Sequence, residues 1–425
     1  MFRITSLHVL CIGIRGFNLR LHVCIPHRRT SLRVGINIMY LPGDVDVTTM
    51  KKHLCKVFHG KEINSIAATA RKKLVLHFDL NKTIVPVDSA TGETVEAALN
   101  VYLSGLAQGK DRQGEWHSKH ELSTAPVEQD DVSYYKFEEK RLLPQITRDR
   151  SAFRYHLMSF TDKPQGSKFK PHLKELLNSL TWTLPYEEKA HKDLTVPGST
   201  SYRYHFILPA FYKLLESLVT ENRNFCVVFR TYGSDAKSVL SSIRQAVSGD
   251  FPFGRKLLPL LDDIDETVYF VSRQNDIEDV FTIDRCSSDC SDINDMTSKT
   301  DEEIYSWISN MVGIHAIRDN CNDWLRHDFD SRRGKPFWID KTDEFHHHVF
   351  FDDNIRPGSV DSIANIRVRD NFVSAFRNID RKEEHAYLNK NLVPVVFTDA
   401  IMDDEYFVKQ LRLCEDNFSK DVYTY

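Results

Sequence analysis

The residues best suited to chemistry in this sequence stand where three apolar runs end. The runs are short and continuous, which is typical of strands buried on both faces of a sheet. They cover residues 74–78, 225–229 and 349–351. The polar residues that follow are Asp79 after the first run, Arg230 and Thr231 after the second, and Asp352 and Asp353 after the third. If the strands are parallel neighbours, these side chains meet at one edge of the sheet, where open α/β sheets bind ligands.

The side chains at this edge would carry an excess of negative charge. Two or three carboxylates in a small volume repel one another and need a cation, and oxygen ligands with water favour Mg²⁺. A lysine beside an aspartate and a hydroxyl can hold a phosphoryl group. Lys335, in a Gly-Lys-Pro sequence before the third run, is the first candidate for that lysine, and Lys341 is the second. The simpler alternative is that Asp79 only caps a turn, as Asp often does.

The elements that must position these residues alternate between strands and helices, which predicts an α/β fold with a Rossmann-like parallel sheet. Helical spacing of apolar residues predicts helices over 92–106, 211–219, 236–247 and 406–413, and a broadly helical segment over 304–325. Further strands are expected at 268–271 and 393–397, and a closing strand and helix at 360–380. Residues 107–135 and 285–303 are polar and are predicted to be loops. Asp235 is expected to cap the helix that follows it, which would leave the Thr231 hydroxyl free.

Four motifs, in their order along the chain, resemble those of the haloacid dehalogenase-like (HAD) superfamily. They are FDLNKT at 78–83, VVFRT at 227–231, GKP at 334–336 and VFFDD at 349–353. Each motif alone is weak, but the ordered set with its strand context is fairly specific.

This resemblance implies a role for each residue of the motifs. Asp79 would be the nucleophile that forms an aspartyl-phosphate, Thr231 would hydrogen-bond the phosphoryl oxygens, and Lys335 would pair with Asp79 and the phosphate. Mg²⁺ would be the cofactor. Its ligands would be the Asp79 carboxylate, the backbone carbonyl of Asn81 and the Asp352 carboxylate, with Asp353 in support.

One residue departs from the family pattern. HAD phosphatases usually carry a second Asp two residues after the nucleophile, and it protonates the leaving group and later activates water. The residue here is Asn81, and a carboxamide cannot exchange a proton near neutral pH. General acid–base catalysis of this kind is worth about 100- to 10,000-fold. Turnover could therefore be slow, confined to good leaving groups, helped by another residue, or absent.

The spacing of the motifs predicts the domain organisation. Residues 44–88 begin the HAD core with a helical lead-in over 44–71, and 89–220 form a large, mostly helical cap insertion. Residues 221–425 complete the core and include a second insertion at about 248–330. Such caps exclude water and select small substrates. The alternative is that the first insertion supplies packing helices or an oligomer contact.

The first 43 residues differ in composition from the rest. They contain six arginines and no Asp or Glu, which resembles a mitochondrial transit peptide. A short signal-peptide core and an over-extended gene start, with Met39 or Met50 as the true initiator, are the alternatives. We expect this N-terminal extension to lie outside the main fold. The protein is expected to be cytoplasmic, or mitochondrial if the extension is a transit peptide.

The composition of the 425 residues narrows the class of protein. The net charge of -4 implies no general attraction to nucleic acid. No apolar run reaches the roughly 18 residues needed to span a membrane. The eight cysteines are scattered without zinc-finger spacing, so reduced thiols are expected. The leading function is Mg²⁺-dependent hydrolysis or transfer of a phosphoryl group from a small phosphorylated substrate. The alternative is a HAD-fold protein that binds a ligand or partner and does little chemistry.

Overall fold

The computed structural model describes residues 7–14, 17–24, 33–35, 71–88, 91–142, 150–199, 201–249, 254–273, 281–285 and 297–422. The chain divides into two compact units, residues 1–70 and 71–425. The expected helical lead-in over 44–71 lies outside the described residues, apart from Arg71.

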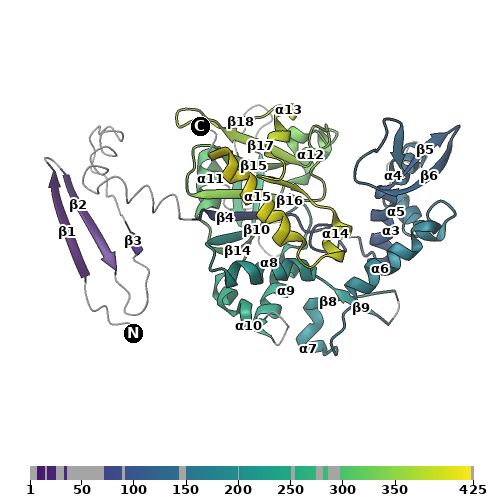
Figure 1. Cartoon of the computed structure of the whole chain (residues 1–425), viewed down its shortest axis with the longest axis horizontal. Coiled ribbons are helices and arrows are strands. Elements are labelled where there is room, and N and C mark those ends of the chain that lie inside the picture. The colour runs from purple at the N-terminus through teal and green to yellow at the C-terminus, as the bar shows by residue number, and fades with distance from the viewer. Residues whose placement is uncertain are drawn as a thin grey trace. The chain divides into compact units, whose positions relative to one another are not determined.

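The first unit contains an antiparallel sheet of three strands (Figure 1). They are β1 (Leu7–Ile14), β2 (Phe17–Cys24) and β3 (Arg33–Gly35). The central strand is β2, which pairs with both of the others.

The second unit is built around an eight-stranded sheet in the order β13-β12-β11-β14-β10-β4-β16-β19. The six strands from β11 to β19 run parallel, whereas β12 and β13 are antiparallel to their neighbours. The result is a mixed α/β fold with a mostly parallel sheet, as the sequence predicts. The bounds are β13 (Thr297–Lys299), β12 (Phe281–Arg285), β11 (Ile264–Arg273), β14 (Gly313–Asp319), β10 (Phe225–Thr231), β4 (Lys73–Phe78), β16 (His346–Asp352) and β19 (Leu392–Pro394).

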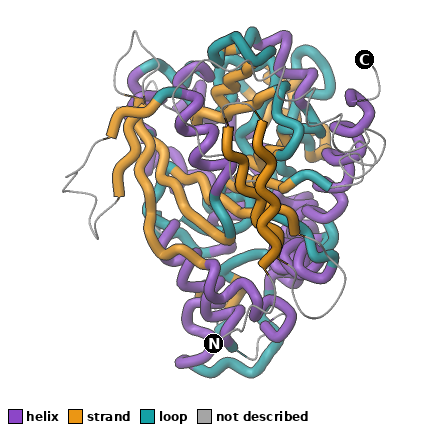
Figure 2. Tube along the Cα trace, turned by 90° about the vertical axis from the view of Figure 1, so that its left-hand side faces the viewer, coloured by secondary structure: helices purple, strands orange, loops and turns teal. Residues whose placement is uncertain are grey.

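Both faces of the sheet are covered, which explains why β4 is apolar on both sides. Leu74, Leu76 and Phe78 join a core with α8 (Pro209–Thr220), α9 (Ala236–Ser248) and α15 (Tyr406–Val422). Val75 points the other way, into a core with α11 (Asp301–Asn310) and β15 (Lys335–Asp340). β15 belongs to a second small sheet with β17 (Ala364–Arg369) and β18 (Arg377–Asn378). Figure 2 shows helices packed around the strands rather than segregated from them.

The segment between β4 and α8 mixes helices and strands and lies together at one side of Figure 1. Its helices of eight or more residues are α3 (Val95–Leu106), α4 (Tyr134–Leu142), α5 (Arg150–Leu157) and α6 (Lys170–Leu180). The loop predicted over 107–135 is wrong, because β5 (Ala107–Arg112) and β6 (Glu115–Leu122) form a hairpin there and β7 (Asp131–Ser133) pairs with β5. Gln113 and Gly114 both have positive φ, which allows the tight turn of this hairpin.

The broadly helical prediction for 304–325 is also wrong in its centre. Gly313 has a φ of +87°, and a Cβ there would lie 2.0 Å from the carbonyl oxygen of Asp263. The helix α11 ends before this glycine, and β14 enters the main sheet after it. The range 248–330, expected as a second insertion, therefore supplies β11, β12, β13 and β14 to the same sheet.

Two smaller differences concern the C-terminal part. Residues 360–380 form β17 and β18 without the expected helix, and the short helix α13 (Arg381–Glu384) follows them. β19 is an edge strand, as Pro394 predicts. Among the described residues, the structure has no helix of the length and hydropathy needed to cross a membrane.

Candidate functional site

Three neighbouring strands end at the same level of the main sheet. Phe78 of β4 is in register with Phe229 of β10 and with Phe351 of β16. The next residue of each strand is therefore at the same edge. After β4, the chain first forms β10 on one side of β4 and later forms β16 on the other side of β4. This edge is a topological switch point, the place where open α/β sheets bind ligands.

Lys335 joins two of these strand ends. Its Nζ lies 2.5 Å from Oδ1 of Asp79 and 2.8 Å from Oδ2 of Asp352, and it also donates to the backbone carbonyl of Arg230 at 3.1 Å. Lys335, Asp79 and Asp352 are all buried. Lys341, the second candidate, instead pairs with Asp370 in a partly exposed position. The structure thus brings Lys335, and not Lys341, to Asp79.

Asp353 completes a group of three carboxylates. Asp79, Asp352 and Asp353 each offer an oxygen, and these oxygens lie within 4.8 Å of one another. Burial raises the pKa of Asp79 to about 7, an increase that Lys335 opposes and Asp352 adds to. Burial together with Asp352 and Asp79 raises the pKa of Asp353 well above its usual range. For Lys335, burial lowers the pKa, but the charges of Asp352 and Asp79 raise it above its ordinary value overall.

The hydroxyl of Thr83 connects the first and fourth motifs. It donates to Oδ2 of Asp79 at 3.3 Å and accepts from the backbone N–H of Asp353 at 3.2 Å. Asp352 is fixed in turn, because its Oδ1 accepts from the backbone N–H of Asn354 at 2.8 Å. The carboxylates are therefore held in place by the protein itself.

Asn81 and Thr231 lie on the other side of the site, around Gly233. A Cβ atom added at Gly233 would lie 3.5 Å from Thr231 Oγ1 and 3.8 Å from Asn81 Nδ2. Asn81 Nδ2 donates to Oδ2 of Asp235 at 3.1 Å, while Asn81 Oδ1 is buried and has no hydrogen-bond partner among the described residues. Asp235 stands at the N-cap position of α9 as expected, but its side chain makes no cap hydrogen bond to the helix. The Thr231 hydroxyl accepts from the Gly233 N–H at 3.0 Å and keeps its own O–H to donate.

A buried ion pair that the sequence did not reveal lies next to Lys335. Arg230 donates to both carboxylate oxygens of Asp319, at 2.9 and 2.6 Å, and to the backbone carbonyl of Pro336 at 2.9 Å. Asp319 is buried at the end of β14. Arg230 thus holds the backbone beside Lys335 while its own carbonyl accepts from the Lys335 ammonium.

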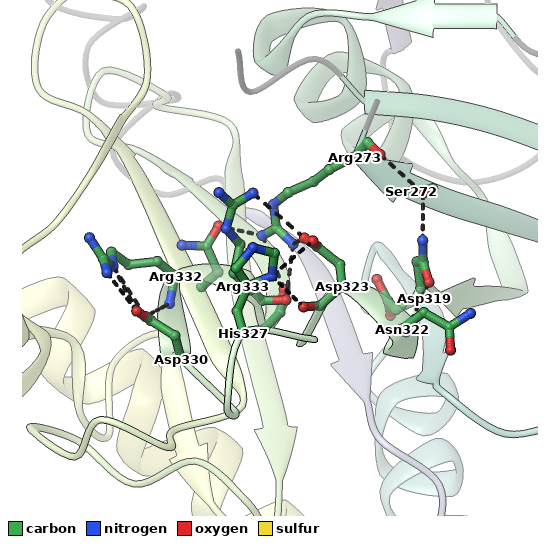
Figure 3. Close-up of polar contacts among 12 residues, drawn as sticks. Ser272, Arg273, Asp319, Asn322, Asp323, His327, Asp330, Arg332 and Arg333 are labelled. Carbon is green, nitrogen blue, oxygen red and sulfur yellow. Dashed lines mark hydrogen bonds and ion pairs between the residues drawn. The ribbon is translucent and has the colours of Figure 1, made fainter. Parts of the chain in front are cut away.

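The segment that leads into Lys335 is held by a second polar network (Figure 3). Arg273 of β11 donates to the backbone carbonyls of Arg333 and Gly334, both at 3.1 Å, and to Oδ1 of Asn365 at 2.8 Å. Asp323 of α12 (Cys321–Arg326) faces Arg273 at 3.4 Å and Arg333 at 3.8 Å. These contacts hold in place the backbone of Arg333 and Gly334, which directly precede Lys335.

A pocket of about 370 Å³ lies where the segment between β4 and α8 meets the chain that follows β19. Tyr102 of α3 joins these two parts, because its hydroxyl accepts from the backbone N–H of Phe397 at 2.9 Å. Burial and the charge of Asp353 raise the pKa of Tyr102. The backbone N–H of Val395, beside the lining residue Val396, donates to the carbonyl of Asp352 at 3.1 Å, so this region lies near the carboxylates. The lining residues include Leu106, Leu122, His172, Val396, Thr398 and Met402.

The charges of a second acidic group among the described residues are compensated differently. Glu128, Asp130 and Asp131 lie on the β5–β7 side and are paired with Lys110 and Lys119. Two lysines there face three carboxylates, and two of the three are exposed. Solvent and lysines compensate this group, whereas Asp79, Asp352 and Asp353 share one buried lysine.

Comparison of the chain with protein-family models, with curated proteins and with solved structures finds no match in any of the three. The functional interpretation therefore rests on the residues and the geometry of the site.

Proposed function

We propose that residues 71–425 form a HAD-like, Mg²⁺-dependent phosphatase or phosphotransferase that acts on a small phosphorylated substrate. The observation that carries the proposal is the buried contact of Asp79 with Lys335, beside Asp352 and Asp353, at the switch point of the sheet. A carboxylate, a lysine and a hydroxyl-bearing strand end are the parts that phosphoryl transfer through an aspartate requires.

The donors at the site suit a hard divalent cation. Asp79, Asp352 and Asp353 supply closely spaced carboxylate oxygens, and Asn81 Oδ1 is a buried acceptor without a partner among the described residues. Mg²⁺ prefers such oxygen ligands, and it would be held by Asp79, the backbone carbonyl of Asn81 and Asp352, with Asp353 in support. When bound, it would neutralise charge on the carboxylates and on the phosphoryl oxygens.

The residues of the chain then have distinct roles in the proposed reaction. The Asp79 carboxylate attacks phosphorus as the bond to the leaving oxygen breaks, and water later hydrolyses the aspartyl-phosphate. Lys335 holds the charge that develops on the phosphoryl oxygens, and Thr231 donates its hydroxyl to one of them. In the HAD interpretation of the fold, the segment 89–220 is the cap and the 370 Å³ pocket receives the rest of the substrate.

The alternative is a HAD-fold protein that binds a ligand or partner with little turnover, and Asn81 favours it. The Asn81 side chain donates to Asp235 and carries no exchangeable acid. The leaving oxygen would then depart unprotonated, unless it is a good leaving group or another residue assists.

Turnover of an aryl phosphate and of a panel of phosphorylated metabolites separates the two functions. Wild type, Asp79→Asn and Asn81→Asp are compared with and without Mg²⁺. The enzyme proposal predicts Mg²⁺-dependent turnover that Asp79→Asn abolishes and that Asn81→Asp increases, by about 100-fold or more for poor leaving groups. If both wild type and Asn81→Asp are inert, the binding function replaces the enzyme.

A further inference from the structure

Lys82, in the loop between Asn81 and Thr83, has an unusual backbone for its residue type. Its φ is +62°, in the left-handed region, and its N–H donates to the carbonyl of Val85 at 2.8 Å to close the turn. Glycine adopts this conformation without steric cost, whereas lysine does not. Strained residues of this kind cluster at functional sites, because the gain in function offsets the cost.

The Lys82 side chain has no partner among the residues that the structure describes. It is half-buried, and its ammonium makes no hydrogen bond or ion pair with any residue that the structure describes. Lys335, by comparison, is buried and makes three such contacts. The strained turn therefore carries a cation that none of the described residues pairs with.

Lys82 directly precedes Thr83, whose hydroxyl donates to Oδ2 of Asp79 and accepts from the backbone N–H of Asp353. Burial, Asp352 and Asp79 raise the pKa of Asp353, and the positive charges of Lys82 and Arg356 oppose this increase. Arg356 is exposed and already paired with Asp361 at 3.0 Å. Of these two cations, Lys82 is the one without an acidic partner among the described residues.

We propose that Lys82 binds a second anionic group of the substrate, a carboxylate or a further phosphate carried by the leaving group. This inference rests on the proposed function. The buried Lys335 contacts Asp79 and serves the transferred phosphoryl group, which leaves the half-buried Lys82 for a second anionic group. A lysine ammonium binds carboxylate and phosphate alike as a point charge. A substrate with a carboxylate and a substrate with a second phosphate are therefore tested separately.

Matched substrates test the inference. They are phenyl phosphate, 4-carboxyphenyl phosphate and 1,4-phenylene bisphosphate, each measured with Mg²⁺ on wild type, Lys82→Gln and Lys82→Gly. Wild type should prefer at least one of the anionic substrates over phenyl phosphate. Both variants should raise KM for that substrate by about tenfold, the effect of losing one hydrogen bond to a charged group, and leave KM for phenyl phosphate unchanged.

Stability measurements separate this role from a structural one. Lys82→Gly relieves the left-handed backbone, so its unfolding midpoint should equal or exceed that of wild type although the substrate preference is lost. Lys341→Gln is the control, because Lys341 pairs with Asp370 away from the site, and it should keep the wild-type preference.

The outcomes distinguish failure of the inference from failure of the proposed function. Mg²⁺-dependent turnover of phenyl phosphate with the same preference in wild type and Lys82→Gln would overturn the inference alone. If wild type hydrolyses none of the three, calorimetric binding of phenylphosphonate and 4-carboxyphenylphosphonate with Mg²⁺ decides. Tighter binding of the carboxylated compound that Lys82→Gln abolishes supports the role of Lys82, and equal or absent binding overturns it.

Discussion

Two buried ionic groups lie next to each other at the carboxyl edge of the sheet, and they differ in charge balance. Arg230 and Asp319 form a one-to-one pair with two hydrogen bonds, and the guanidinium also satisfies the carbonyl of Pro336. Lys335 faces Asp79 and Asp352 directly, with Asp353 close to both carboxylates. The two groups touch where the Lys335 ammonium donates to the carbonyl of Arg230.

The difference supports the proposal that the first group is structural and that the second binds a ligand. A buried charge is tolerated when its partner and hydrogen bonds are complete, and the Arg230–Asp319 pair meets that condition within the chain. The Lys335 group does not, because burial raises the pKa of Asp79 to about 7 in spite of the neighbouring lysine. A divalent cation would supply the positive charge that the second group lacks.

The largest expected effect comes from breaking the balanced pair. Asp319→Asn leaves the Arg230 guanidinium buried without a counter-ion, and such changes cost roughly 3–5 kcal/mol of unfolding free energy. Urea unfolding measures this loss, which Mg²⁺ should not restore. Asp330→Asn is the control, because Arg332, its partner, is largely exposed and such pairs contribute about 1 kcal/mol or less. A similar small loss in both variants would contradict a structural role for the Arg230–Asp319 pair.

The unbalanced group should make the metal-free protein less stable as the pH rises. The folded pKa of Asp79 is about 7 against an ordinary value of 3.8, so the folded state binds the extra proton between these values. Stability from this group is therefore lost as the pH increases from about 4 to about 7. In EDTA, wild type should lose about 2–3 kcal/mol more than Asp79→Asn between pH 5 and pH 8. Equal pH dependence in the two proteins would show that folding does not raise the pKa of Asp79.

Mg²⁺ should stabilise the wild-type protein through the same group. At about 20 times the dissociation constant, a ligand that binds only the folded state adds about 2 kcal/mol. Thermal unfolding with and without Mg²⁺ measures this increase, which Asp352→Asn should abolish. Asp130→Asn, in the lysine-paired acidic group of the β5–β7 side, should retain it. An increase of the same size in Asp352→Asn would place the Mg²⁺ elsewhere.

The sequence predicts those parts of the site that follow directly from strand ends. Asp79, Asp352 and Lys335 belong to short motifs with clear apolar strands beside them, and these residues lie together. The Arg230–Asp319 pair could not be predicted, because its partners stand 89 residues apart and Asp319 ends a strand that looked helical. Ile304 and Ile308 have true helical spacing, and the apolar residues after Gly313 continue it by chance, although they belong to a strand buried between β10 and β11.

The hairpin of β5 and β6 was missed for a different reason. Most of its residues are polar, and β6 is largely exposed, so the alternation that marks a half-buried strand is absent. The sequence feature that indicates this hairpin is its turn, where the Asp111 side chain accepts from the Gly114 N–H at 2.9 Å. A turn of this kind between two polar segments predicts a hairpin even without an apolar face.

The most direct test of the central claim is whether Asp79 accepts a phosphoryl mimic in the presence of Mg²⁺. Fluorine NMR of the protein with beryllium fluoride detects a bound fluoride complex on an aspartate independently of turnover, so the substitution at Asn81 does not obscure the result. We predict a bound signal in wild type that requires Mg²⁺ and that disappears in Asp79→Asn. The absence of a bound signal in wild type, or an equal signal in Asp79→Asn, would contradict a phosphoryl-transfer site at Asp79.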